Sequence, residues 1–173
     1  MNSEKLTKDD VKKIQAEIDE RKTVLRPKIL EDVKTARAQG DLSENFEYYA
    51  ARKANRENNS RIDYLEKMLK YATIIDDKAT DGICLNNTVK VKFVEEGTEE
   101  SSWEEDTYKI VTSIRADSMK NKVSIESPLG KALLGKKVQE IVEVALDNGS
   151  SYELKIIEID TSTGADDDDI KSF

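Results

Sequence analysis

Two carboxylates near a break between two helical patterns have the residue type and spacing to help hold a divalent cation. Asp41 and Glu44 stand three positions apart in the segment Gly40–Asn45. Mg²⁺ prefers hard oxygen ligands and keeps several waters, so one or two carboxylates can recruit it without a complete protein cage. Two side chains cannot complete the coordination shell. We therefore expect a partner to supply the remaining ligands.

The same residues also have simpler structural interpretations. Asp41 or Ser43 could cap a following helix, and Glu44 could be an acid in its first turn, where the helix dipole favours negative charge. Phe46 and Tyr48, which follow directly, either pack beneath the turn or contact a nucleic acid. Capping and metal binding by Asp41 are compatible with each other.

Two long helical patterns flank this break and must position it. Residues 8–39 contain no glycine and one proline, Pro27, which lacks an N–H and is expected to bend or break the helix. The second helix is predicted from about residue 43 to 72, and its seam includes Asn55 and Asn58, a residue type that fixes register at some cost in stability. The predicted seam residues are Val11, Ile14, Ile18, Leu25, Ile29, Val33 and Ala36 in the first pattern, with Arg21 interrupting, and Tyr48, Ala51, Asn55, Asn58, Ile62, Leu65, Leu69 and Ala72 in the second.

A turn at Gly40–Asp41 requires the two helices to fold back as an antiparallel hairpin. Each arm of about 30 residues would be about 45 Å long at 1.5 Å per residue. Periodicity alone is also compatible with a generic dimerising or spacer coiled coil, which has no use for acids at its turn.

The second half of the chain changes to a period of two, which predicts half-buried strands. The alternating apolar residues are Val89, Val91 and Phe93; Tyr108, Ile110 and Ile114; Val123 and Ile125; Val142, Val144 and Leu146; and Tyr152, Leu154 and Ile156. Asp147–Ser150 is typical of a hairpin turn. Pro128–Leu134 predicts a short helix with Ser127 as N-cap and Gly135 as its stop. We therefore expect an α+β chain: a long antiparallel coiled-coil hairpin followed by an antiparallel sheet with a short helix.

Composition supports this division and excludes several classes of function. Residues 1–76 carry 16 basic and 15 acidic side chains, which leaves 12 basic and 21 acidic ones for the remainder. This acidic balance disfavours binding to bare DNA. One cysteine and no histidine exclude a disulfide framework and a Cys-based metal site, and remove the commonest general base. No apolar run reaches the roughly 18–20 residues of a membrane span, and the first residues lack a signal-peptide pattern, so we expect a cytoplasmic protein.

Two separate motifs resemble one family. Gly40–Asn45, with Glu47-Tyr48, Ala50–Arg52, Arg61-Ile62 and Ile74–Asp76, resembles the N-terminal coiled coil of GreA-type bacterial transcript cleavage factors. Independently, Val123–Lys136 resembles the Ser-Pro to Leu-Leu-Gly-Lys segment of the same family. The resemblance runs from about residue 6 to 160. It divides the chain into a hairpin (1–76) with its tip at 40–45, a linker (77–86), a globular domain (87–160) and an acidic tail (161–173).

The resemblance implies a fold and a function. The globular domain is expected to be FKBP-like and to bind the rim of the secondary channel of RNA polymerase, while the hairpin enters the channel. Asp41 and Glu44 are expected to help hold Mg²⁺ in the polymerase active centre, so that a backtracked transcript is cut and elongation resumes. The chain itself is then not an enzyme. The sheet domain offers few aromatic residues for an apolar pocket, so we do not expect prolyl isomerase activity.

The resemblance also assigns two contact surfaces. A basic group near the tip is expected to bind the 3′ segment of the nascent RNA, whose phosphates need positive charge. The expected residues are Arg37, Arg52, Lys53 and Arg56 for RNA, and Ser127, Pro128, Leu133, Leu134 and Gly135 for polymerase. A solvated helix face and ordinary core packing are the structural alternatives for these two sets. We expect a monomer. The acidic segment 95–106 and the aspartates 166–169 leave open a specialised paralogue with altered affinity for polymerase. The alternative function is a channel-binding regulator of the same family that does not promote cleavage.

Overall fold

The computed structural model describes residues 4–38, 45–75, 82–162 and 170. They fall into two compact units, one comprising residues 9–73 with the N-terminal residues 1–4, the other comprising residues 74–173 with residues 5–8. The elements are β1 (Lys5–Leu6), α1 (Lys8–Glu20), a π-helical segment (Arg21–Leu25), α2 (Arg26–Ala38), α3 (Phe46–Tyr71), β2 (Thr73–Ile74), β3 (Thr88–Phe93), β4 (Glu105–Val111), β5 (Lys122–Ser124), α4 (Pro128–Leu133), β6 (Ile141–Ala145) and β7 (Ser151–Asp160). The predicted combination of a helical hairpin and a sheet with one short helix is confirmed.

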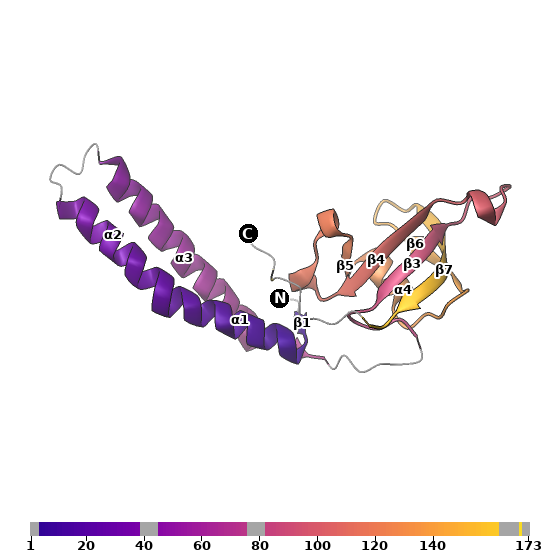
Figure 1. Ribbon diagram of the computed structural model, residues 1–173, viewed down its shortest axis with the longest axis horizontal. Coiled ribbons are helices and arrows are strands. Elements are labelled where there is room, and N and C mark those ends of the chain that lie inside the picture. The colour runs from indigo at the N-terminus through magenta and orange to yellow at the C-terminus, as the bar shows by residue number, and fades with distance from the viewer. Residues whose placement is uncertain (1–3, 39–44, 76–81, 163–169, 171–173) are drawn as a thin grey trace. The chain divides into compact units, whose positions relative to one another are not determined.

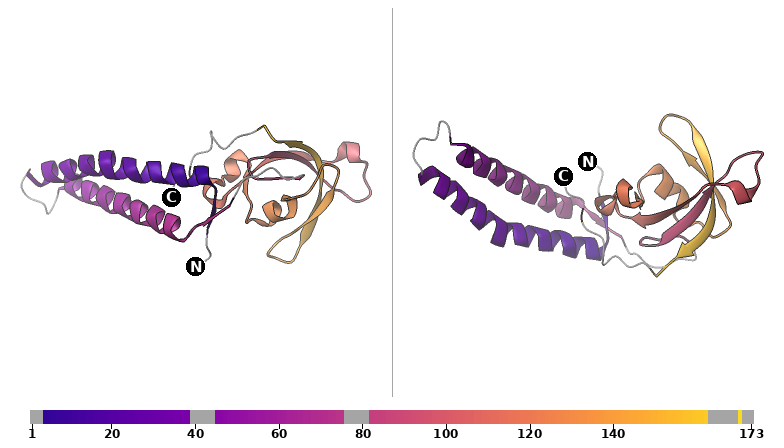
Figure 2. Two further views of the ribbon diagram at one scale, coloured as in Figure 1. Left: turned by 90° about the horizontal axis from the view of Figure 1, so that it is seen from below. Right: turned by 45° about the horizontal axis from the view of Figure 1, so that its top comes forward.

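The first unit is a two-armed helical hairpin. One arm runs through α1, the π segment and α2 as one bent helix, and α3 lies alongside it (Figures 1 and 2). Buried residues on the facing surfaces include Ile14, Ile18, Ile29, Ile62 and Leu65. Beside the N-terminal end of α1, the Thr73 N–H donates to the Glu4 carbonyl at 2.8 Å, which ties together the two chain segments at the open end of the hairpin.

The irregular turn in the first arm precedes the proline. The Arg26 N–H donates to the Arg21 carbonyl, five residues back, and the Thr23 hydroxyl donates to the Asp19 carbonyl at 2.7 Å. The π segment ends two residues before Pro27, and the helix continues through the proline as α2. The wider π turn also shifts the seam. Leu25, predicted on the seam, is 36% exposed, which corrects that assignment.

The second unit is built on a five-stranded sheet in the order β5-β4-β3-β7-β6. Most neighbours are antiparallel, but β5 pairs with β4 in parallel, so the prediction of a purely antiparallel sheet is wrong in this detail. After β4, short 3-10 turns at Ser113–Arg115 and Ser118–Lys120 reverse the chain twice, and β5 therefore resumes the direction of β4.

Helix α4 and the inner face of this sheet enclose the core of the second unit (Figure 2). The side chains of Val89, Val91, Ile110, Leu154 and Ile156 are all fully buried. A register shift between β3 and β7 pairs Lys90 with Glu158 but Val91 with Ile156, which leaves Ile157 as an extra residue. This bulge explains why the inward positions of β7 change from even to odd numbers at Ile159, which packs against the core.

Candidate functional site

The two arms of the hairpin are tied together next to the acidic turn by one asparagine. Asn45 is the N-cap of α3, where its side-chain oxygen accepts from the Tyr48 N–H at 2.9 Å. Its side-chain nitrogen donates to the carbonyl of Ala36, in the last turn of α2, at 2.8 Å. One amide therefore satisfies an unpaired group at the start of one helix and another near the end of its partner.

This cap corrects the expected start of the second helix. The N-cap is Asn45, so neither Asp41 nor Ser43 caps α3, and Glu44 precedes the cap rather than lying in the first turn. The acid in the first turn is Glu47. Asp41 and Glu44 themselves lie outside the described residues. Asn45 accepts from two N–H groups at the start of α3, through its side chain from Tyr48 and through its carbonyl from Tyr49.

Tyr48 anchors the beginning of α3 to the hairpin. Its side chain is 9% exposed, its ring meets that of Tyr49 edge-on at 5.8 Å between centroids, and the Arg52 guanidinium lies 5.7 Å from its centroid. The burial of Tyr48 therefore agrees with a packing role, one of its two predicted alternatives. Phe46, by contrast, is exposed, with 87% of its surface accessible to solvent.

The four residues predicted to bind RNA are all exposed and belong to the same end of the hairpin. Arg37 lies in the last turn of α2, where the helix dipole favours a cation. Arg52, Lys53 and Arg56 lie in the second and third turns of α3. The Lys53 ammonium is 3.7 Å from the Glu57 carboxylate, and both side chains are mostly exposed, so this pair contributes little and leaves Lys53 accessible.

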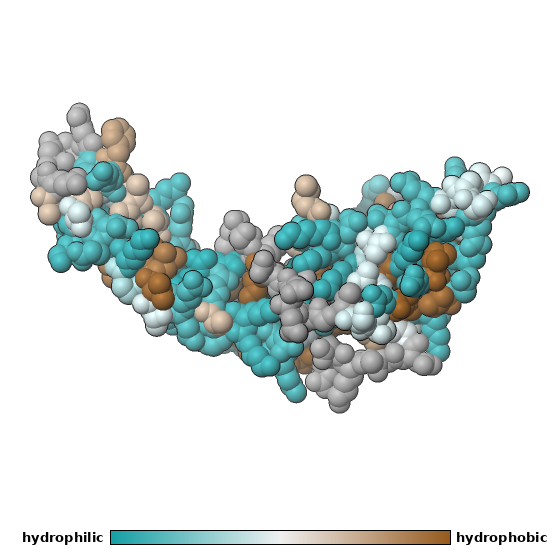
Figure 3. Space-filling view, in the orientation of Figure 1, coloured by the Kyte–Doolittle hydropathy of each residue, from teal (hydrophilic) through white to brown (hydrophobic). Residues whose placement is uncertain are grey.

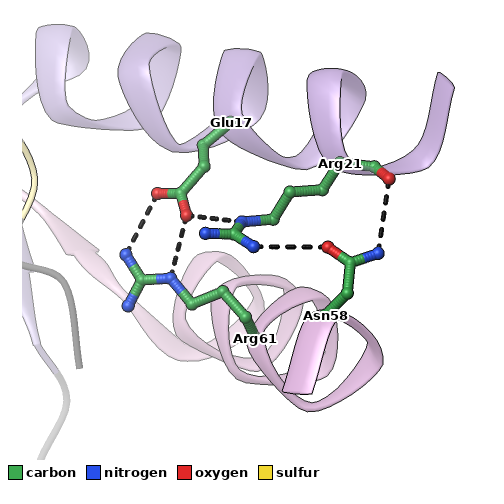
Figure 4. Close-up of polar contacts among 4 residues, drawn as sticks. All are labelled: Glu17, Arg21, Asn58 and Arg61. Atoms are coloured by element: carbon green, nitrogen blue, oxygen red, sulfur yellow. Dashed lines mark hydrogen bonds and ion pairs between the residues drawn. The ribbon is translucent and has the colours of Figure 1, made fainter. Parts of the chain in front are cut away.

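A polar network crosses the hairpin interior at the level of the π segment (Figure 4). Arg61 binds the Glu17 carboxylate with two hydrogen bonds of 2.9 and 3.0 Å, and Arg21 adds a third at 2.7 Å. Arg21 also donates to the side-chain oxygen of Asn58 at 3.2 Å, and the Asn58 amide donates to the Arg21 carbonyl. Each contact between the arms fixes which residue of α1 faces which residue of α3.

The charge of Glu17 is retained in this partly buried place. Burial raises the pKa of its carboxyl group, but the hydrogen bonds and positive charges of Arg61 and Arg21 act in the opposite direction and together prevail. The net pKa of Glu17 is therefore below its ordinary value, and the carboxylate is ionised at neutral pH.

The segment predicted to contact polymerase forms the short helix α4 and its flanks. The Ser127 hydroxyl accepts from the Gly130 N–H at 3.0 Å and donates to the Ser124 carbonyl at 2.7 Å, which confirms the predicted N-cap with Pro128 at the helix start. A Cβ at Gly130 would lie 2.0 Å from the Ser124 carbonyl oxygen, so only glycine allows α4 this close to β5. Gly135 follows the helix at a φ of +78°, as a C-terminal stop requires.

The two leucines of this segment have different environments. Leu133 is fully buried in the core, so it can shape the outer surface but cannot touch a partner directly. Leu134 is 43% exposed, and two further exposed apolar side chains, Val138 and Ile141, follow it closely in the chain. Sequence reasoning missed Val138 and Ile141. The alternating pattern of β6 could have identified Ile141, because it stands at an outward position next to the buried Val142 and Val144.

Within the described ranges, no group of three or more acidic, cysteine or histidine side chains could hold a metal ion. No helix in the same ranges is long and apolar enough to cross a membrane.

Comparison with known proteins places the chain in a class and then in a family. Residues 4–74 match the family described as "Transcription elongation factor, N-terminal", and residues 78–161 match "Transcription elongation factor, GreA/GreB, C-term". Both units thus have the sequence of bacterial elongation factors, and in the expected order. The chain belongs to the GreA/GreB family.

Individual relatives agree with this assignment. The transcription elongation factor GreA of Macrococcus caseolyticus is 43% identical over 155 residues, which cover 89% of this chain and 94% of the relative. That of Thermoanaerobacter pseudethanolicus is 46% identical over 156 residues, with 89% and 95% covered. Among solved structures, GreA factor homolog 1 of Thermus thermophilus aligns over 91% of this chain and 99% of its own at 22% identity, with a TM-score of 0.42.

Proposed function

We propose that this chain binds RNA polymerase through its secondary channel and stimulates Mg²⁺-dependent cleavage of backtracked nascent RNA, while the polymerase itself carries out the chemistry. The observation that supports this most directly is the acidic turn in a family member whose hairpin is tied beside that turn. Asn45 links α2 to α3, so the segment that carries Asp41 and Glu44 is closed by a hydrogen-bonded bridge.

Asp41 and Glu44 fit Mg²⁺ by the chemistry of their donors, since the ion prefers carboxylate oxygens and keeps several waters. When bound in a two-metal site, the ion would activate water and stabilise the charge that develops during phosphodiester hydrolysis. Two carboxylates fill only part of an octahedral shell. The polymerase active centre must therefore supply the other ligands, which makes this chain a cofactor of another enzyme.

Two surfaces support the remaining steps of the proposal. Arg37, Arg52, Lys53 and Arg56 present exposed positive charge to the phosphates of the displaced RNA. On the second unit, Ser127, Pro128, Leu134 and Gly135, shaped from beneath by Leu133, would contact the polymerase rim, and the exposed Val138 and Ile141 extend this surface. The protein acts as a monomer in this proposal, in the cytoplasm.

The test uses a backtracked bacterial elongation complex with labelled RNA and Mg²⁺. The native chain should accelerate release of a short 3′ RNA fragment. The double variant Asp41→Asn/Glu44→Gln should bind polymerase equally well but lose about a hundredfold or more in cleavage rate, the scale on which a preorganised electrostatic group contributes.

The matched control is Glu31→Gln/Asp32→Asn, which removes the same two charges from exposed positions of α2. It should cleave like the native chain. Binding without stimulated cleavage by the native chain would favour a channel-binding regulator instead, and absence of binding would reject the proposal.

A further inference from the structure

One line of exposed side chains on α3 changes from aromatic to cationic along the helix. Phe46 and Tyr49 are 87% and 54% exposed, and Lys53 and Arg56 continue the line with exposed side chains. Their spacings of three, four and three residues place all four on one face of the helix. We call these four residues the α3 stripe. It spans about 15 Å, since Phe46 and Arg56 are ten positions apart and the helix rises 1.5 Å per residue.

Packing of the hairpin does not account for the aromatic end of the stripe. The interior contact at this level is made by Tyr48, which is 9% exposed, whereas Phe46 on the first turn leaves nearly all of its ring in water. A phenylalanine at this position also adds nothing to helix capping, which Asn45 provides. Single exposed apolar residues are common on protein surfaces, but here two aromatic rings adjoin two cations in one line.

Part of the stripe is held in place by the buried tyrosine beneath it. The Tyr49 ring meets the Tyr48 ring at an interplanar angle of 62°, and Arg52 lies over the Tyr48 ring beside the stripe. Tyr49 is therefore supported from below while more than half of its surface faces solvent. On the face of the hairpin that Figure 3 shows, the surface is mostly hydrophilic, with small separate apolar areas.

We propose that the α3 stripe binds unpaired RNA, with bases stacking on Phe46 and Tyr49 and phosphates bound by Lys53 and Arg56. Every base has a π-face that an aromatic ring can cover, and a cationic stretch beside the rings follows the backbone; single-stranded nucleic acids are bound by this combination irrespective of sequence. Charge complementarity favours RNA over an apolar protein segment as the occupant. The inference rests on the proposed function, which supplies a displaced RNA 3′ segment.

The experiment removes either an aromatic ring from the protein or the bases from the displaced RNA segment. Backtracked elongation complexes are assembled with a displaced 3′ segment that is either natural or abasic. Phe46→Ala and Tyr49→Ala are compared with Phe46→Trp, which retains a ring, and with Tyr71→Ala, which removes an equally exposed ring (55%) from the other end of α3. Circular dichroism and competition for polymerase verify that each variant folds and binds.

On natural RNA, each alanine variant should need at least about fivefold more factor for half-maximal cleavage, the lower end of the contribution of one base–aromatic stack. Phe46→Trp and Tyr71→Ala should match the native chain. On abasic RNA, native and alanine variants should behave alike, because no base remains to stack.

Two results would overturn the inference while the proposed function stands. One is equal activity of native and alanine variants on natural RNA. The other is an equal loss on natural and abasic RNA, which would mean that the rings contact polymerase. Failure of the native chain to stimulate any cleavage would reject the proposed function, and the inference with it.

Discussion

The hairpin and the sheet unit bury different chemistry at their centres. In the core cluster of the sheet unit, the side chains are aliphatic, and Val89, Val91, Ile110, Leu154 and Ile156 are all fully buried. In the hairpin, the residues in contact at mid-length are Glu17, Arg21, Asn58 and Arg61, of which Asn58 and Arg61 are only 3% and 7% exposed. The sheet unit also buries a charged side chain, Arg115, which donates to Thr112 and Asn86, but this residue lies outside the aliphatic core cluster. In the hairpin, an ion pair between Arg61 and Glu17 interrupts the apolar seam itself.

Apolar burial and the ionic network contribute different properties: the first mainly stabilises a unit, and the second mainly fixes the register of its elements. Burial of apolar surface is strongly stabilising but not directional, and cores accept many arrangements of similar volume. A hydrogen-bonded ionic network contributes less net stability but is satisfied in only one alignment of its partners. The sheet already has its register set by the backbone ladder, whereas two helices can slide. The proposed function requires the hairpin to present its acidic residues at a fixed distance, and for that task alignment is the more valuable property.

The largest expected effect comes from a substitution that creates a cavity in the core of the sheet unit. Leu154→Ala should lower its free energy of unfolding by about 2–5 kcal/mol, because a fully buried leucine loses its contacts and leaves a void. Denaturant titration followed by amide hydrogen exchange would localise the loss. Amides of α3 should keep their protection. A loss below about 1 kcal/mol would mean that this core collapses readily around the gap.

An intermediate effect is expected in the hairpin. Arg61→Met should cost about 1–3 kcal/mol, because Glu17 keeps its partly buried charge but loses two hydrogen bonds. The matched control is Lys22→Met, which breaks the exposed pair between Lys22 and Glu66 and should cost less than about 1 kcal/mol. Unfolding monitored by helical circular dichroism measures both variants.

The ion pair between Glu17 and Arg61 can also be replaced as a pair, while Arg21 keeps its hydrogen bond to Asn58. In Glu17→Leu/Arg61→Met the isolated charge is absent, so stability should recover relative to Arg61→Met, while stimulated cleavage stays reduced because the arms lose their fixed alignment. Full recovery of both stability and cleavage would show that the network does not set the register.

The smallest expected effect is a dependence on pH. The pKa of Glu17 is lowered from 4.5, so its charged form stabilises the folded hairpin most fully above that value. Below it the unfolded chain binds the proton first, and the contribution is lost as pH falls through the folded pKa. The difference in unfolding free energy between the native chain and Glu17→Gln should therefore be largest above about pH 4.5 and shrink in more acidic solution. A constant difference would contradict the assigned role of Glu17.

Sequence reasoning recovered the features that depend on local pattern. Alternating residues predicted the strands, Ser127 and Pro128 predicted the start of α4, and the hairpin turn after β6 was confirmed, with Gly149 at a φ of +84°. Features that depend on long-range contacts were missed. Arg21 was interpreted as an interruption of the seam, because nothing local shows that Glu17, Asn58 and Arg61 would surround it. The direction of β5 likewise depends on two short turns that the periodicity does not show.

In the candidate site, too, local features were predicted and features that depend on long-range contacts were missed. The exposure of the four predicted RNA-binding residues agrees with their helical positions, but the role of Asn45 was not foreseen. Its signal was a residue type suited to capping, in competition with Asp41 and Ser43 nearby. The choice among the three depends on where α2 ends, because the second hydrogen bond of Asn45 reaches back to Ala36. The sequence could propose caps but could not select the one that also bridges the arms.

A small change in helix direction at the π segment is amplified along α2. From Leu25 to Ala38 the helix extends for 13 residues, or about 20 Å at 1.5 Å per residue. A change of direction by about 10° at the π turn would therefore displace the end of α2 by about 3–4 Å, more than the length of a hydrogen bond. Substitutions between Arg21 and Leu25 can thus misplace groups far from themselves without breaking any contact near the turn.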